Sequence, residues 1–418
     1  MVVTLSNGIK LVLEKMPYVR SISFGIWVKN GSRHEVETTN GISHFIEHML
    51  FKGTEKRSAK DIADEMDSIG GQINAYTSRE ITCYYTKTLD EHFDIALDVF
   101  KDMFLNSKFD EDEIEKEKNV ILEEISMYED TPDEVAYDLL NSSMWKNCSL
   151  GFPIIGTAKN VSSFTHRDFK NYYNNKYTPQ NTVISVAGNF DVDKMIEKIE
   201  RHFSEFRNNK TEEQTGQTTE YKVCVVQKEK DIEQVHLVAG FPGLDIKSEE
   251  LYTMSVFSTV FGGGMSSRLF QKIREEHGLA YSVYSTHSSY EDAGLFSIYA
   301  GLSRNNVESV LNHVLGEIKN LYTDKITTDQ LERTKNQIKS GYLLNLESSS
   351  SRMSSIGRSQ IMLNRVLTPD EVIERIDKIT IDRLYDVVSQ VLNLDNMSLS
   401  VVGDIRGLNI EEMLKDAR

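Results

Sequence analysis

Two nine-residue stretches, one in each half of the chain, are nearly alike. The first is Asn181-Thr-Val-Ile-Ser-Val-Ala-Gly-Asn189 and the second is Asn396-Met-Ser-Leu-Ser-Val-Val-Gly-Asp404. Each is rich in β-branched and small apolar residues, which is typical of a buried strand. Their offset, 396 − 181 = 215, is about half the length of the 418-residue chain. This offset indicates an internal duplication.

A second pair of stretches supports the duplication. Residues 111–119 read Glu-Asp-Glu-Ile-Glu-Lys-Glu-Lys-Asn, and residues 328–336 read Thr-Asp-Gln-Leu-Glu-Arg-Thr-Lys-Asn. Their offset is 328 − 111 = 217, and both have the spacing of an amphipathic helix. Chance similarity between helices and strands is the alternative, but two matches in the same order at nearly one offset favour duplication.

The two halves meet at a polar segment. Residues 207–220 contain no apolar side chain, so this segment cannot bury surface to offset its ordering entropy. We predict a linker at 209–219 between an N-terminal domain, 1–208, and a homologous C-terminal domain, 220–418. In each half the strand patterns cluster apart from the helical runs. The predicted fold class is therefore α+β, with two duplicated domains, each a mostly antiparallel sheet covered by helices.

Composition limits the partners and the compartment. Lys+Arg 47 against Asp+Glu 64 gives a net charge of −17, which argues against nucleic acid and anionic membranes and weakly favours cationic substrates. The three cysteines are too few for a disulfide scaffold, so a reducing cytoplasm is expected. The first residues show no secretory signal, and no apolar stretch approaches the ~20 residues of a membrane span.

The main chemical signal is His44-Phe-Ile-Glu-His48. If residues 41–51 form a helix, His44 and His48 lie at i and i+4 on one face, where two imidazoles can share a metal ion. Glu47 lies beside them and would take a proton from a metal-bound water. Chance predicts only roughly 0.02 such pentapeptides for ten histidines in this chain. The alternative is a helix with two buried histidines bonded to backbone or acidic groups.

Zinc needs a third protein ligand, and the acidic helix predicted at 110–129 is the best source. Glu117 and Glu124 lie seven positions apart and share a helix face. On composition alone, Glu123, Glu124 and Glu129 all compete as the ligand. Without the histidine pair, a solvated surface helix would be the better interpretation.

The chain resembles the pitrilysin/insulinase-type zinc metallopeptidases, the inverzincins. It is most similar to their short-chain branch, which includes the mitochondrial processing peptidase and its bacterial relatives. In this family the His-x-x-Glu-His motif is followed by a distant Glu ligand, and the family spacing counted from His48 reaches Glu124 (124 − 48 = 76). The resemblance implies one Zn²⁺ per chain, held by His44, His48 and Glu124, with Glu117 as a supporting carboxylate.

The resemblance also implies substrate-binding residues. The stretch Arg274-Glu-Glu-His-Gly-Leu-Ala-Tyr281 is similar to the family's Arg and Tyr pair, which grips the substrate and stabilises the oxyanion. Residues 70–77 resemble the stretch that leads into an edge strand beside the metal, with Asn74 and Ala75 as candidate backbone contacts. The alternatives are a surface Arg with a core Tyr, and an ordinary Gly-Gly turn. Gly262-Gly263-Gly264 looks like a short glycine-rich loop, or a flexible turn.

The function implied is a zinc metalloendopeptidase that cleaves extended or unfolded peptides in a dimeric, processing-peptidase-like chamber. A homodimer is expected, because one chain carries both the zinc motif and the Arg/Tyr pair. Only the first half would hold metal, since residues 251–259 contain no His or Glu and the offset of the helical pair carries Glu124 to Gly341 (124 + 217 = 341). The alternative is a non-catalytic structural or chaperone-like subunit of the same fold.

Overall fold

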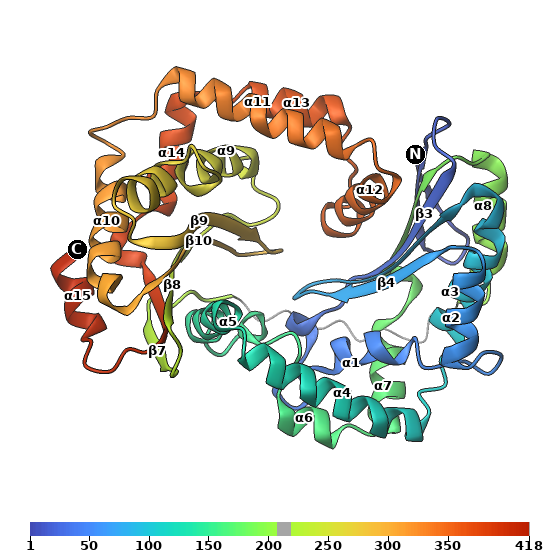
Figure 1. The fold of residues 1–418 in the computed structure, drawn as a ribbon. Coiled ribbons are helices and arrows are strands. Elements are labelled where there is room, and N and C mark those ends of the chain that lie inside the picture. The colour runs from blue at the N-terminus through green and yellow to red at the C-terminus, as the bar shows by residue number, and fades with distance from the viewer. Residues whose placement is uncertain (207–218, 418) are drawn as a thin grey trace. The chain divides into compact units, whose positions relative to one another are not determined.

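The described part of the chain forms two β-sheets, each with its own helices (Figure 1). The computed structural model describes residues 1–206 and 219–417. The chain divides into two compact units that are discontinuous in sequence. Unit 1 is Met1–Ser126, Phe152–Gln217 and Leu343–Leu367, and unit 2 is Met127–Gly151, Thr218–Tyr342 and Thr368–Arg418.

The sheet of unit 1 has six strands in the order β1-β2-β6-β3-β5-β4. All neighbouring pairs are antiparallel except β2 and β6, which are parallel. β6 is buried along its whole length, as its continuous apolar run predicts for a central strand. The strands are β1 (Val2–Thr4), β2 (Lys10–Lys15), β3 (Ser21–Val28), β4 (Gln72–Thr77), β5 (Thr82–Leu89) and β6 (Thr182–Gly188).

The sheet of unit 2 has five strands in the order β7-β11-β8-β10-β9, again with one parallel pair, β7 and β11. Counted along the chain, both sheets place their strands in the order first, fifth, second, fourth, third once β1 is set aside. This shared topology confirms the duplicated fold class. The strands are β7 (Val225–Glu229), β8 (Gln234–Pro242), β9 (Ala280–Ser289), β10 (Gly294–Ser303) and β11 (Ser398–Gly403).

The duplication extends to backbone detail. Gly188 and Gly403 end β6 and β11, and both have φ of 146°. A Cβ at Gly188 would clash with the Ser21 carbonyl oxygen, and one at Gly403 would clash with the Gln234 carbonyl oxygen. The strand-end glycine of the repeated stretch is thus required by the same close approach in both sheets.

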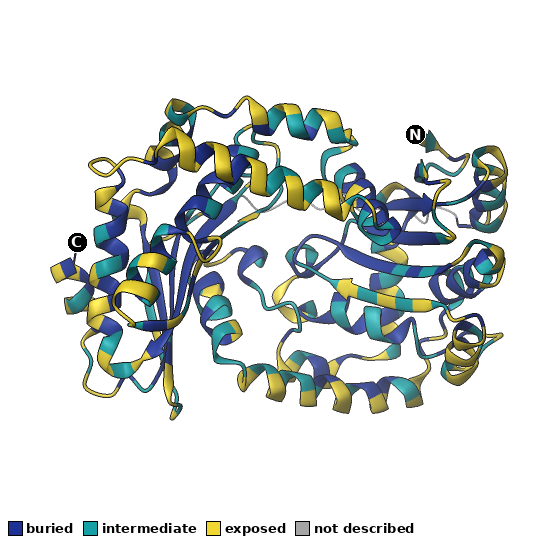
Figure 2. Ribbon diagram, turned by 45° about the horizontal axis from the view of Figure 1, so that its top comes forward, coloured by how far each residue is buried: buried dark blue, intermediate teal, exposed yellow. Residues whose placement is uncertain are grey.

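Helices cover both faces of each sheet, so the central strands are buried on two sides. In Figure 2 the strands are largely dark blue, whereas the helices alternate between buried and exposed residues. The helices of unit 1 are α1 (Ile42–Met49), α2 (Ala59–Ser68), α3 (Phe93–Asn106), most of α4 (Glu111–Glu129), α6 (Ala158–Ser163), α7 (His166–Lys176), α8 (Val192–Phe203) and α12 (Ser349–Leu363). Those of unit 2 are α5 (Pro132–Met144), α9 (Leu251–Gly262), a helix at Phe270–Glu276, α10 (Val307–Asn320), most of α11 (Thr328–Asn345), α13 (Pro369–Asp377), α14 (Ile381–Val391) and α15 (Ile410–Ala417).

The two repeats exchange one helix each. α12 comes from the second half of the chain but packs on β6, β3 and β2 of unit 1. α5 comes from the first half but packs on β11, β8 and β7, the corresponding strands of unit 2. The predicted domains 1–208 and 220–418 describe the two sequence repeats, and this division stays a prediction. The linker predicted at 209–219 lies outside the described residues except for Thr219.

The helices predicted at 41–51 and 110–129 are confirmed as α1 and α4 within two residues at each end. Among the described residues, no helix is long and apolar enough to cross a membrane.

Candidate metal centre

α1 carries the histidine pair and is held by its opposite face. Phe45, Ile46 and Met49 are buried in the core of unit 1, as their spacing predicts. His44 and His48 are partly exposed on the other side. The apolar face therefore fixes the rotation of the helix, and that rotation turns both imidazoles outward together.

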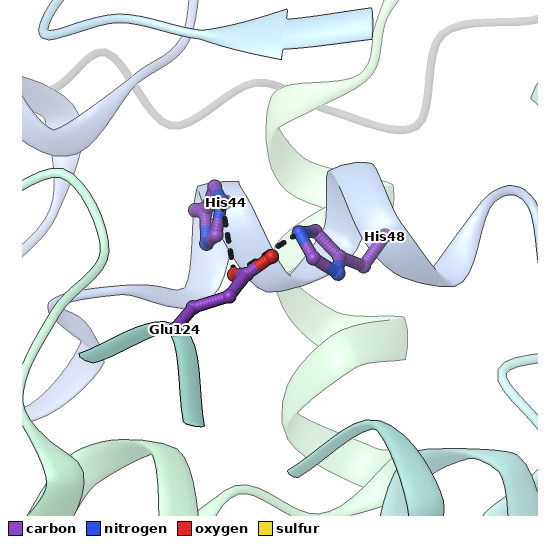
Figure 3. Close-up of side chains that lie close together, drawn as sticks. All are labelled: His44, His48 and Glu124. Atoms are coloured by element: carbon purple, nitrogen blue, oxygen red, sulfur yellow. Dashed lines mark ion pairs between the residues drawn. The ribbon is translucent and has the colours of Figure 1, made fainter. Parts of the chain in front are cut away.

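The three candidate ligands converge (Figure 3). The rings of His44 and His48 lie 4.6 Å apart, centroid to centroid. Glu124 reaches them from α4, with its Oε2 4.0 Å from His44 Nε2 and 3.6 Å from His48 Nε2. One ligand atom from each residue lies within 4.8 Å of the other two, and no other such group of three is found among residues 1–206 and 219–417.

This arrangement fits a zinc ion. Zinc binds imidazole nitrogens and carboxylate oxygens at about 2.0–2.2 Å in tetrahedral geometry, which places neighbouring ligand atoms roughly 3.4 Å apart. The distances from Glu124 Oε2 to the two imidazole nitrogens are close to that value. Glu124 Oε2 is also buried without a hydrogen-bond partner among the described residues, and a bound cation would satisfy it. Three protein ligands leave the fourth position open, as in catalytic zinc sites.

The second imidazole is oriented by a carboxylate. His48 Nδ1 lies 2.8 Å from Glu117 Oε1, and Lys52 Nζ lies 2.5 Å from Glu117 Oε2. Burial opposes ionisation of Glu117, but the hydrogen bonds from His48 and Lys52 lower its pKa overall. An ionised carboxylate only accepts hydrogen bonds, so His48 Nδ1 is the donor. In the neutral imidazole, the form that binds a metal, Nε2 then carries the lone pair and faces Glu124.

The two histidines differ in their electrostatics. Burial, together with the charge of His48, lowers the pKa of His44 to about 3, so His44 is neutral and able to bind metal at neutral pH. Burial also lowers the pKa of His48, but the Glu117 hydrogen bond and the charges of Glu124 and Glu47 outweigh it and raise the pKa overall. His44 has no orienting carboxylate: its Nδ1 is buried without a hydrogen-bond partner in the described part of the chain.

Glu47 is held beside the pair by the end of β4. Thr77 Oγ1 donates a hydrogen bond of 2.5 Å to Glu47 Oε2. Burial raises the pKa of Glu47, and the Thr77 hydrogen bond opposes this rise in part. A raised carboxyl pKa suits a group that must both take and release a proton near neutral pH.

Thr77 and Lys52 were not found by sequence reasoning. Lys52 follows His48 by four positions and Thr77 follows the Asn-Ala pair, but neither spacing alone indicates a role. The other ligands that composition allowed lie elsewhere: Glu123 is exposed, and Glu129 forms salt bridges with Lys228 and Lys230.

β4 forms a free edge of its sheet beside α1. Among the described residues it pairs with β5 alone, and α1 packs against it. Asn74 is exposed and Ala75 is half-buried in this strand. The Ala75 N–H donates a hydrogen bond of 2.8 Å to the side chain of Asn74.

Arg274 and Tyr281 come together in unit 2. The Arg274 guanidinium lies over the Tyr281 ring at 5.2 Å and over the Phe270 ring at 4.8 Å. Tyr281 is 73% exposed, so its hydroxyl is available to a ligand. The three glycines at 262–264 end α9 and line a cavity of about 700 Å³ in the same unit.

Comparison with known proteins assigns the family. The family model described as insulinase (peptidase family M16) matches residues 10–158, and the model described as the peptidase M16 inactive domain matches residues 163–338. The protein named uncharacterized zinc protease YmxG of Bacillus subtilis is 45% identical over 397 residues, covering 94% of this chain and 95% of its own. The chain belongs to peptidase family M16.

A second curated relative and a solved structure extend the comparison. A zinc protease of Streptomyces coelicolor is 38% identical over 410 residues, covering 96% of this chain and 89% of its own. The crystal structure of a protease from Helicobacter pylori superimposes with a TM-score of 0.92 at 23% identity, covering 96% of this chain and 99% of that one. The latter similarity concerns the fold alone. The names of the curated M16 relatives imply zinc, and the family resemblance inferred from the motifs is confirmed.

Proposed function

We propose that this M16 chain is a zinc-dependent endopeptidase that cleaves extended or unfolded peptides. The observation that carries the proposal is the convergence of His44, His48 and Glu124 within 4.8 Å, with Glu47 beside His48. The curated relatives, which are named zinc proteases, support the same chemistry.

Each residue would have a separate task. His44, His48 and Glu124 would hold the zinc ion, one per chain. Bound zinc would supply a Lewis acid that polarises the scissile carbonyl and makes water more acidic. Glu47 would take a proton from the attacking water and pass it to the leaving amine, while Thr77 holds one of its carboxylate oxygens.

The substrate would bind as an added strand. The free edge of β4 offers main-chain groups at Asn74 and Ala75, and an extended peptide can pair with such an edge whatever its side chains. The Asn74 side chain would have to leave the Ala75 N–H for this pairing. The net charge of −17 favours cationic peptides.

Arg274 and Tyr281 would stabilise the negative charge that develops on the scissile carbonyl oxygen. We propose a cytoplasmic, processing-peptidase-like homodimer in which this pair acts on a peptide at the metal site of the second chain. The stacking of Arg274 on Tyr281 supports a joint role, because it holds a cationic and a phenolic donor side by side.

Substitution of the base tests the proposal. Glu47→Gln keeps the shape of the side chain but removes the base, so cleavage should fall by about 10²–10⁴-fold. Zinc should remain at one per chain, because all three proposed ligands are kept. The measurements are cleavage of an unstructured peptide mixture and metal analysis of the same sample. Full turnover by zinc-loaded Glu47→Gln protein, or wild-type cleavage that a chelator does not stop, would contradict the proposal. A non-catalytic subunit would show no chelator-sensitive cleavage.

Mixing tests the homodimer. Glu47→Gln protein is combined with Arg274→Ala/Tyr281→Phe protein under conditions of subunit exchange. If the Arg/Tyr pair acts on the second chain, part of the activity returns, because one of the two sites in a mixed dimer is complete. Activity that never returns, although mixed dimers form, would refute action on the second chain.

A further inference from the structure

The first turn of α1 lacks a cap of its own. Its N-cap residue is Gly41, at φ of 100°, which offers no side chain to the free N–H groups of the turn. A Cβ at Gly41 would approach the Gly156 Cα at 2.8 Å, so a capping side chain could not be accommodated here without backbone movement. The N–H groups that begin the histidine helix must therefore be satisfied from elsewhere.

Glu35 takes this role from the preceding loop. Its Oε2 accepts hydrogen bonds from Gly41 N at 2.8 Å and Asn40 Nδ2 at 2.9 Å. Its Oε1 accepts one from Ser43 N at 2.8 Å. The residue is only 4% exposed. A carboxyl group in this position also complements the helix dipole, whose positive end is the N-terminus.

The turn that Glu35 holds carries His44, whose ring contacts Glu124 through Nε2 at 4.0 Å but has no carboxylate on its Nδ1 side among the described residues. His48 is oriented through Nδ1 by Glu117, at 2.8 Å. His44 Nδ1, in contrast, has no hydrogen-bond partner in the described ranges. The place of the His44 imidazole therefore depends on its packing and on the backbone of the first turn, next to Ser43.

We propose that Glu35 is a positioning residue for the metal centre: by bonding Gly41 N and Ser43 N, it fixes the turn that aims His44 at Glu124. This inference rests on the proposed function, because it concerns the same site. Glu35 does not touch the ion or the substrate and acts only through His44.

Glu35→Gln tests the proposal with little change of shape. A carboxyl group accepts from all three donors, but an amide has one accepting oxygen, so at least one of Gly41 N and Ser43 N would face an NH₂ group. Zinc affinity is measured by competition with a chromophoric chelator. The visible spectrum of the cobalt(II)-substituted protein reports the ligand geometry without any turnover. We expect zinc affinity at least about tenfold weaker, as for other residues that orient metal ligands, and an altered cobalt spectrum.

Glu317→Gln is the matched control. Glu317 is also a buried glutamate, 8% exposed, and its Oε2 accepts a hydrogen bond of 3.0 Å from Arg268 in unit 2. This variant should lose thermal stability yet keep the wild-type zinc affinity and cobalt spectrum. Glu35→Asp keeps the carboxyl group but shortens its reach, and it should show a smaller loss in the same direction. It also provides the test if Glu35→Gln does not fold.

The outcomes separate the two claims. A Glu35 variant that is less stable but binds zinc and cobalt as the wild type does would overturn the positioning role. So would an equal loss of affinity in Glu317→Gln. If the wild-type protein itself binds neither zinc nor cobalt, the proposed function fails, and the positioning role fails with it.

Discussion

α1 and α9 occupy corresponding places in the two repeats: α1 follows β3 and α9 follows β8, the second strand of each repeat once β1 is set aside. The two helices differ in the side chains that they carry. Ile22 and Val235 adjoin the equivalent strand-end glycines, which gives an offset of 235 − 22 = 213. This offset carries His44 to Phe257 and His48 to Phe261. The two phenylalanines are fully buried and stack at 5.3 Å, whereas the two histidines are partly exposed and 4.6 Å apart.

The helices that carry the acidic-helix stretches, α4 and α11, also differ in whether they carry carboxylates at two corresponding positions. The offset between the two acidic-helix stretches (328 − 111 = 217) carries Glu117 to Thr334 and Glu124 to Gly341. α4 thus supplies two carboxylates to the histidines, while α11 has none at the corresponding positions. The same fold therefore carries a cluster of candidate metal ligands on α1 and a buried aromatic pair on α9. The scaffold sets where the i and i+4 side chains meet, and the side chains alone decide whether a metal can bind.

The largest expected effect on zinc binding comes from replacing a histidine of α1 by the phenylalanine that stands at the corresponding position of α9. His44→Phe or His48→Phe removes one of three ligands, so zinc affinity should fall by more than the roughly 100-fold that loss of an orienting partner can cost, and cleavage should reach background. Metal analysis and a peptide cleavage assay measure both. His92→Phe, at a histidine outside the ligand cluster, is the control. Stoichiometric zinc in His48→Phe protein would contradict the claim that the side chains at these positions decide whether zinc binds.

Truncation of an α9 phenylalanine should have the converse effect: it should lower stability and leave zinc affinity unchanged. Phe257→Ala opens a cavity in a fully buried aromatic pair, which costs about 3–5 kcal/mol of stability. Zinc affinity should stay at the wild-type value, because no proposed ligand is changed. The shift of the urea-induced unfolding transition and a zinc titration below that transition are the measurements. A large loss of zinc affinity with little loss of stability would assign Phe257 to the metal centre instead.

The supporting carboxylate should have an intermediate effect. Glu117→Gln leaves the ligands in place but weakens the hydrogen bond that orients His48, so zinc affinity should fall about 10–100-fold. Glu123→Gln, an exposed neighbour on the same helix, should change nothing. Equal affinities in the two variants would mean that the contact between Glu117 and His48 does not support the site. Competition with a chelator at fixed pH distinguishes these results.

The smallest expected effect is at Gly341, the residue of the second repeat that corresponds to Glu124. Gly341 lies inside α11, and a Cβ there would meet nothing within 4 Å. Gly341→Ala should therefore raise stability by up to about 1 kcal/mol, since alanine loses less backbone entropy in a helix. Thermal unfolding is the measurement. Marked destabilisation would show that Gly341 is required for the stability of unit 2, and that it is more than a helix position without a ligand.

The sequence predicted the fold class because duplication and strand patterns are local signals. The stretch around Gly188 repeats at Gly403, and the two sheets share one topology. The exchange of α5 and α12 was not predicted, because packing on the other repeat leaves no trace in the spacing of a single helix. Ser348 caps α12 by accepting a hydrogen bond from Ser351 N, and no prediction was made for this helix from the sequence.

The site was predictable to different depths. His44, Glu47 and His48 share a pentapeptide, so helical periodicity alone placed them on one face. Residue type alone did not decide the third ligand, because several glutamates of the acidic helix competed. The family spacing selected Glu124, and the structure places Glu124 beside the two histidines. Glu35 and Thr77 escaped notice, because a single glutamate in a loop or a threonine at a strand end has no spacing that distinguishes it.

The central claim is that three side chains, two from α1 and one from α4, hold a single zinc ion. Diffraction data from zinc-loaded crystals, collected at the zinc absorption edge, test it most directly. We expect one anomalous peak per chain, at about 2.0–2.2 Å from a nitrogen of His44, a nitrogen of His48 and a carboxylate oxygen of Glu124. A peak bound by other residues, with these three side chains turned apart, would contradict the claim.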